Sequence, residues 1–151
     1  MSKAKRQAIL AVDVGSHRTG VAVSDDDRRM ALPLETVESR ALHEVAERLC
    51  QLVEDYEVAT VVVGWPVDMS GREGKSIDRV KALLKHFERR LKRRDLDIPI
   101  EKWDERMTSS AADRLLIEAD VSRRRRKDAV DQVAATKILE GYLGRLRFEE
   151  Q

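Results

Sequence analysis

The most constraining feature of the sequence is a run of apolar, mostly β-branched residues at positions 58–64. Strands that are buried on both faces have this composition, and they are typically parallel strands of an α/β sheet. The segment before the run, residues 41–56, carries apolar residues at the spacing of one helix face. A helix that leads into a doubly buried strand indicates an α/β domain whose sheet is covered on both sides.

The other segments complete a mixed sheet. Residues 8–14 and 19–24 resemble two strands joined by a short glycine-containing turn, which suggests a hairpin. Residues 30–37 predict a third strand, and Pro33 favours an edge or a bulge there. Further along the chain we expect helices at 77–91, 108–119 and 128–146, a strand at 98–103, and loops at 68–75 and 120–127. The resulting order, βββαβαβαα, implies a five-stranded mixed sheet with helices on both faces.

The size and composition fit one domain. A chain of 151 residues with 42% apolar residues can bury a substantial core and leaves little room for a second domain. We expect a single domain over 1–151, with flexible ends at 1–7 and 147–151. The lone cysteine, Cys50, lies in a helical pattern and is expected in the core. No apolar run approaches the ~20 residues that span a membrane, and the N-terminus lacks a signal peptide, so we expect a cytoplasmic protein.

Charge is distributed unevenly although the net charge is only +1. Basic residues cluster at 89–94 and again at 123–127, and local basic patches attract phosphate even on a near-neutral protein. The first cluster is equally well explained as a solvated helix face. The second cluster is a run of like charges that repel one another, and a bound polyanion would relieve that repulsion.

The first candidate for chemistry is Asp13, inside an apolar strand and followed by Gly15. A carboxylate in such a strand is costly unless it is paired or binds a metal, although it could also accept hydrogen bonds from the following turn. Asp-x-Gly before a hairpin fits both actin-like ATPases and RNase H-like nucleases. The ATPases need two such domains, and the sequence has no Walker loop, so the nuclease interpretation is favoured.

Two further groups of acids follow predicted strands and helices. Asp104 and Glu105 stand just beyond a short strand, where function is usual in α/β sheets, although Glu105 could simply pair with Arg106. Asp128 and Asp131 are three residues apart on one helix face. Asp128 is also explained as an acid favoured near a helix N-terminus, whereas Asp131 adjoins the apolar face.

Asp13, Glu105 and Asp131 can converge at one end of the sheet. Carboxylates are ligands for hard divalent ions, and one or two Mg²⁺ or Mn²⁺ ions could activate water for phosphodiester hydrolysis. We therefore predict these three as catalytic and metal-binding residues. A fourth ligand stays open between Asp128, Asp104 and Asp25.

Four ordered blocks of the sequence resemble a known family. They are residues 11–15 with 18–25, residues 63–66 with 68–71, residues 104–109, and residues 131–135. This set is similar to the bacterial YqgF (RuvX-type) family, whose members are named as Holliday junction resolvases and as pre-16S rRNA nucleases. The resemblance implies an RNase H-like fold, a cytoplasmic location and maturation of the 5′ end of 16S rRNA. It also implies that Asp13, Glu105 and Asp131 match the family's acidic site.

The sequence departs from that family at two apolar positions. Trp65 and Met107 stand where the family commonly has leucine, and neither change touches the proposed ligands. Trp65 could stack on a base, but we interpret it as a core residue.

Several basic residues are candidates for phosphate contact, with surface ion pairing as the alternative. Two of them lie in the loop 68–75, which should stand near the acidic site, and the basic segment 123–127 is expected to order on substrate. The predicted nucleic-acid-binding residues are Arg18, Arg72, Lys75, Arg106, Arg123, Arg124, Arg125, Arg126 and Lys127.

Three functions remain open from the sequence. The favoured one is a nuclease acting on structured RNA such as pre-rRNA. The second is a resolvase of branched DNA, which would require a dimer because two strands are cut symmetrically. The third is a ribosome-assembly factor that binds RNA without cutting it. The sequence fits either a monomer or a weak dimer.

Overall fold

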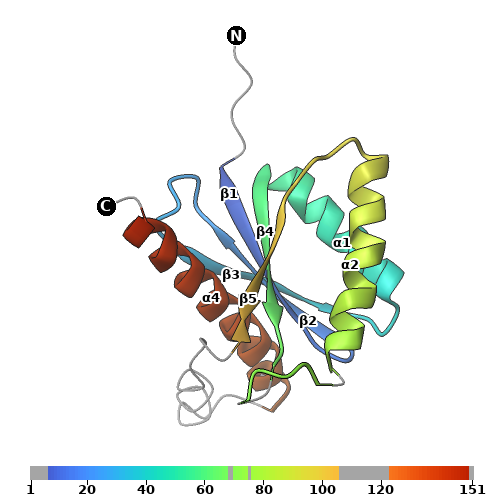
Figure 1. Ribbon diagram of the computed structural model, residues 1–151. Helices are drawn as coiled ribbons and strands as arrows, with labels where there is room; N and C mark the ends of the chain where they lie inside the picture. Colours follow the sequence, from blue (N-terminus) through green and yellow to red (C-terminus); the bar gives the residue numbers. More distant parts are fainter. Residues whose placement is uncertain (1–6, 68–69, 75, 106–122, 150–151) are drawn as a thin grey trace.

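The computed structural model describes residues 7–67, 70–74, 76–105 and 123–149, and for 123–131 it describes the backbone alone. The strands are β1 (Ala8–Val14), β2 (Arg18–Ser24), β3 (Ala31–Glu38), β4 (Val58–Trp65) and β5 (Ile100–Asp104). The helices are α1 (Leu42–Asp55), α2 (Ser76–Arg93) and α4 (Arg123–Glu149) (Figure 1).

The strands form one sheet in the order β3-β2-β1-β4-β5. β2 is antiparallel to both of its neighbours, whereas β1, β4 and β5 run parallel to one another. This arrangement confirms the predicted five-stranded mixed sheet. We call the end of the sheet where β1, β4 and β5 finish its carboxyl end, because residues that follow these three strands are brought together there.

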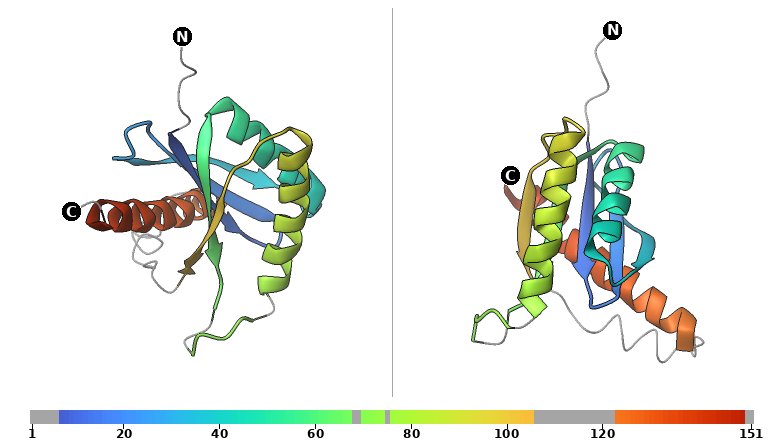
Figure 2. Two further views of the ribbon diagram at one scale, coloured as in Figure 1. Left: turned by 45° about the horizontal axis from the view of Figure 1, so that its top comes forward. Right: turned by 90° about the vertical axis from the view of Figure 1, so that its right-hand side faces the viewer.

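Helices cover both faces of the sheet. α1 and α2 pack side by side on one face, and α4 crosses the other (Figures 1 and 2). Leu10 and Val12 of β1 belong to the core beneath α1 and α2, while Ile9 and Ala11 belong to the core beneath α4. This alternation shows that β1 is buried on both faces, as β4 is, and that the sheet separates two apolar cores.

Pro33 occupies the position that its missing N–H group favours. It lies on β3, an outer strand of the sheet, opposite Ala22, and the register of β2 and β3 shifts between Val21 and Ala22. A proline at an edge strand beside a bulge costs no ladder hydrogen bond inside the sheet. The expectation drawn from the sequence is confirmed.

The basic segment at 123–127 was expected to be a loop, and this expectation was wrong. Helix α4 already begins at Arg123. Arginine and lysine are good helix formers, but they carry no apolar periodicity, so the visible pattern starts only near Val130. The helix continues through 147–149, which the sequence interpretation assigned to a flexible tail. The helix expected at 108–119 lies outside the described residues.

Two single residues are buried as expected. Cys50 is fully buried in α1, and Trp65 at the end of β4 is 8% exposed and packs in the core beneath α1 and α2. Within the described ranges, no helix is long and apolar enough to cross a membrane.

Candidate active site at the carboxyl end of the sheet

Asp13 is the penultimate residue of β1, at the carboxyl end of the sheet. Side chains alternate between the faces of a strand, and Ile9 and Ala11 face α4. Asp13 therefore lies on the α4 face, where it is partly buried.

Glycines flank Asp13 on both neighbouring strands. Gly20 of β2 is its direct partner. On the other side Val12 pairs with Val63 of β4, so the next position on β4, beside Asp13, is Gly64. Neither neighbour has a side chain, so no Cβ of an adjacent strand lies beside this carboxylate on the α4 face.

Glu105 follows the last residue of β5 and leans over β4. A Cβ placed on Gly64 would lie 2.6 Å from Oε1 of Glu105 and 2.8 Å from Cδ1 of Ile138 in α4. The Glu105 side chain therefore occupies the space above Gly64, between the sheet and α4. The structure thus brings Asp13 and Glu105 to the same face and the same end of the sheet, on either side of a glycine.

Gly64 was missed from the sequence although a signal was present. A glycine inside a strand often marks a close approach of another group, and here it ends an otherwise β-branched run. By its composition alone, that run predicts only a buried strand.

Helix α4 crosses the sheet next to these residues. Gln132 Nε2 donates a hydrogen bond to Thr36 Oγ1 at 3.4 Å, and Thr36 is paired with Gly20 in the row that contains Asp13. Asp131 precedes Gln132 by one residue and lies one helical turn before the buried Ala135. The side chains of Asp131 and Asp128 lie outside the described part of the chain, so their role as ligands stays a prediction.

The other two candidates for a fourth ligand lie elsewhere. Asp25 is at the opposite end of the sheet, where its carboxylate accepts hydrogen bonds from the amides of Arg29 (2.8 Å) and Met30 (2.9 Å). The Met30 hydrogen bond lowers the pKa of Asp25, which is therefore a turn residue. Asp104 is the neighbour of Trp103, which faces α4, so alternation places Asp104 on the other face from Glu105.

Arg79 of α2 holds the turn that follows Asp13. Its Nε donates to the carbonyl of Gly15 at 2.5 Å, and its two terminal nitrogens donate to the carbonyls of Ser39 and Arg40, each at 3.3 Å. One guanidinium therefore fixes the β1–β2 turn against the segment between β3 and α1. Nothing in the helical pattern of α2 distinguishes Arg79, and the sequence interpretation did not identify it.

The loop after β4 is anchored by Glu73. Its carboxylate accepts a hydrogen bond from Trp65 Nε1 at 2.8 Å and pairs with Lys81 at 3.2 Å. The indole hydrogen bond, together with the one from Lys81, lowers the pKa of Glu73. Lys102 Nζ lies 4.1 Å from the centre of the Trp65 ring. This anchor holds the loop that carries the exposed Arg72 at the carboxyl end of the sheet.

The structure describes only some of the basic residues that are predicted to contact phosphate. Arg18 begins β2, at the carboxyl end of the sheet, and forms an ion pair with Glu38 at 2.9 Å, so the ion-pair alternative is observed for this residue. Lys75 and Arg106 lie outside the described residues. Positions 123–127 form the start of α4, of which only the backbone is described. A nucleic-acid contact stays a prediction for all of them.

The donor set suits a hard divalent cation. Asp13 and Glu105 supply carboxylate oxygens, which are the ligands that Mg²⁺ and Mn²⁺ prefer. Among the residues with described side chains, no three His, Cys, Asp or Glu residues gather closely enough to hold a metal ion. The third expected ligand, Asp131, is outside that set.

Comparison with known proteins identifies sequence relatives along nearly the whole chain. A family model described as "RuvX: Holliday junction resolvase" matches residues 7–145. A protein of Moorella thermoacetica is 43% identical over 138 residues, which cover 91% of this chain and 95% of the relative. A protein of Methylocella silvestris is 36% identical over 142 residues, covering 94% and 85%. Both are named "Putative pre-16S rRNA nuclease".

Solved structures show the same fold at low sequence identity. RuvC of Thermus thermophilus superposes with a TM-score of 0.59 at 12% identity, over 92% of this chain and 96% of that one. The structure of T. thermophilus RuvC in complex with a Holliday junction substrate gives a TM-score of 0.58 at 10% identity, over 93% and 96%. The likeness establishes an RNase H-like fold for this chain.

Proposed function

The chain belongs to the RuvX family, and from this we propose that it is a metal-dependent nuclease that processes the 5′ end of pre-16S rRNA in the cytoplasm. The names of the sequence relatives support hydrolysis of an RNA phosphodiester bond. The match covers 95% of the Moorella relative and 85% of the Methylocella relative, so the names apply to most of each matched protein.

One observation carries the proposal. The Glu105 carboxylate lies over Gly64, beside the strand position of Asp13, and both acids are at the carboxyl end of parallel strands. Two carboxylates at one end and on one face of the sheet, with no side chain between them, supply the oxygen ligands that a hard divalent cation prefers.

The residues divide the catalytic work between them. Asp13 and Glu105, with Asp131 from α4, would hold Mg²⁺ or Mn²⁺, which when bound supplies an activated water and stabilises the leaving oxygen. Gly64 leaves the space in which the Glu105 carboxylate lies close to the sheet, beside the strand position of Asp13. Arg18 and Arg72 stand at the same end, where their guanidinium groups can orient phosphate oxygens.

The test is cleavage of a labelled precursor rRNA fragment with Mg²⁺ or Mn²⁺. Asp13→Asn and Glu105→Gln should each lower the rate by at least about 100-fold, since each removes a ligand oxygen. Asp25→Asn and Glu101→Gln are matched controls, because they make the same chemical change at the other end of β2 and at the start of β5. Equal cutting by all four variants would reject the site.

The description of the family model favours a second candidate, resolution of branched DNA. A four-way DNA junction in parallel with the rRNA fragment separates the two. Symmetric cutting of the junction by a dimer, with no cutting of the RNA, would establish the resolvase. Binding of RNA without cutting of either substrate would instead indicate an assembly factor.

A further inference from the structure

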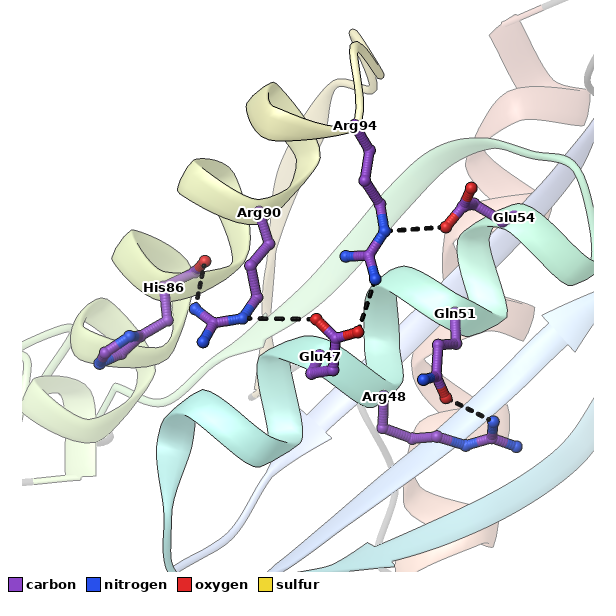
Figure 3. A network of polar contacts seen from close by, with 7 residues as sticks. All are labelled: Glu47, Arg48, Gln51, Glu54, His86, Arg90 and Arg94. Carbon is purple, nitrogen blue, oxygen red and sulfur yellow. Dashed lines mark hydrogen bonds and ion pairs between the residues drawn. The ribbon is translucent and has the colours of Figure 1, made fainter.

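The cations in the C-terminal half of α2, together with Arg94 directly after it, divide into two sets, and the first set forms ion pairs within the protein. Arg90 Nε lies 3.6 Å from Glu47 of α1, and Arg94 lies 2.6 Å from Glu47 and 2.9 Å from Glu54 (Figure 3). The hydrogen bond from Arg94 lowers the pKa of Glu47. These two arginines therefore join α2 to α1.

The second set points to solvent. Lys85, Arg89, Lys92 and Arg93 are exposed, and no described carboxylate lies within ion-pairing distance of them. Their spacing of i, i+4, i+7 and i+8 places them on one face of the helix. With a rise of 1.5 Å per residue, the four charges extend over about 12 Å.

The helix dipole explains only part of this set. Lys92 and Arg93 lie in the last turn, where a cation is favourable. Lys85 and Arg89 lie further inside the helix, where the dipole has little effect. The face also carries the exposed Glu88, so it has four cations and one carboxylate and a net positive charge, which attracts a polyanion laid along it.

The face leads away from the candidate active site. α2 begins at Ser76, after the loop that carries Arg72, and runs back along the sheet from its carboxyl end (Figure 1). Its 18 residues span about 27 Å, which equals on the order of eight nucleotides of a duplex strand. Lys81 lies between the loop and the four cations, so basic residues recur along the helix.

We propose that the outer face of α2, through Lys85, Arg89, Lys92 and Arg93, binds the sugar–phosphate backbone of the substrate arm that extends beyond the cleavage position. This rests on the proposed nuclease function and deepens it, because it assigns a path to nucleic acid outside the acidic site. Phosphate binding is independent of base sequence, so the face contributes affinity and orientation without sequence selectivity.

The chain provides a matched control for this test. Arg89→Gln/Arg93→Gln and Arg90→Gln/Arg94→Gln each remove two arginines four residues apart at the same end of α2. Binding to a labelled RNA hairpin and to a four-way DNA junction is measured against salt in an Asp13→Asn background. The Arg89/Arg93 pair should reduce the salt slope by roughly 1.5 and the affinity several-fold at low salt, with unchanged Tm. The Arg90/Arg94 pair should lower Tm and leave the slope near that of the parent.

Arm length gives a second readout. The difference in affinity and salt slope between the two double variants should appear with substrates whose arms have about sixteen nucleotides. It should vanish with arms of about four nucleotides, which cannot reach the four cations. Equal losses for the two pairs, or a difference independent of arm length, would overturn the proposal. So would a parent that binds neither nucleic acid.

Cleavage separates this proposal from the one it rests on. If wild-type protein cuts its substrate but the two double variants bind alike, the proposed nuclease function is supported and the proposed binding surface on α2 is rejected. If the pairs differ as expected but wild type cuts neither substrate, the face stands as a binding surface and the proposed nuclease fails.

Discussion

At the scale of single residues, the candidate site depends on two glycines, which have no side chain. Gly20 and Gly64 flank Asp13, and the Glu105 carboxylate uses the space above Gly64. The Glu105 carboxylate can lie this close to β4 only because that strand has no Cβ at position 64. The position of Glu105 is therefore determined by Gly64 as much as by β5.

Replacing Gly64 with alanine tests this dependence. The new Cβ would meet Oε1 of Glu105 and Cδ1 of Ile138, so the carboxylate must move by about 1 Å. A displacement of that size should lower kcat by on the order of 100-fold, while the protein stays folded. Gly74→Ala is the control, because a Cβ there meets nothing within 4 Å. A Gly64→Ala enzyme with the rate of wild type would contradict this account of the site.

Tyr142 gives a prediction about pH. Burial of its ring between α4, to which it belongs, and the sheet, reinforced by the hydrogen bond it donates to Glu101 at 2.5 Å, raises its pKa from 10.0 to about 12. Its contribution to stability is fully present below pH 10. The contribution is lost as the pH rises through about 12, because the unfolded state releases the proton first. Tyrosinate absorbance should show a step near 12 that Tyr142→Phe removes; a wild-type protein without that step would contradict the prediction.

At the scale of elements, helix α4 determines how closely the core between this helix and the sheet can pack. A Cβ on Gly141 would lie 2.7 Å from the Trp103 ring, whereas one on Gly144, three residues later, would meet nothing within 4 Å. Trp103 also meets the Tyr142 ring edge-on, with the ring centres 6.3 Å apart. The helix thus leaves no room for a side chain at Gly141, where the Trp103 ring of β5 packs against it.

The two glycines should respond oppositely to the same substitution. Gly141→Ala should destabilise the protein by about 1–3 kcal/mol, because the ring of Trp103 must shift. Gly144→Ala should stabilise it by about 0.5–1 kcal/mol, because alanine is the better helix former. Denaturant unfolding of the two variants measures both values, and two changes of the same sign would show that α4 is not seated as described.

Helices and strands with apolar periodicity were predictable from the sequence, and residues that act through backbone geometry were not. The run at 58–64 and the spacing in α1 and α2 give β4 and two helices within a few residues. The start of α4 was not predicted, because its basic residues show no apolar periodicity. The role of Arg79 was not predicted, because its partners are backbone carbonyls of two turns distant in sequence, which come near it only once the chain has folded. Asp13 and Glu105 were identified by residue type and position, but their approach over Gly64 required the sheet register.

At the scale of the whole molecule, a bound metal would join parts that are far apart in sequence. Asp13 and Glu105 come from strands on either side of β4, and Asp131 comes from the helix over them. A ligand that binds only the folded state stabilises it by about 2.7 kcal/mol at 100 times its Kd. Metal binding should therefore be visible as a stability increment of the entire domain.

Thermal unfolding with and without Mn²⁺ measures that increment. We expect Tm to rise by roughly 5–10 °C at saturating Mn²⁺ for wild type, and by much less for Asp13→Asn. Asp25→Asn, whose carboxylate is at the opposite end of the sheet, should respond as wild type does. An equal rise for all three proteins would place the metal outside the candidate site.

The division of the molecule by its sheet also gives it two optical reporters. The sequence has two tryptophans, and each lies in a different core: Trp65 beneath α1 and α2, and Trp103 beneath α4. In a Trp103→Phe variant the fluorescence comes from Trp65 and reports on the core beneath α1 and α2. In a Trp65→Phe variant it comes from Trp103 and reports on the core beneath α4. Because α4 carries Asp131, the Trp103 signal alone would register whether the helix leaves the sheet before the rest of the domain melts, without any label being attached.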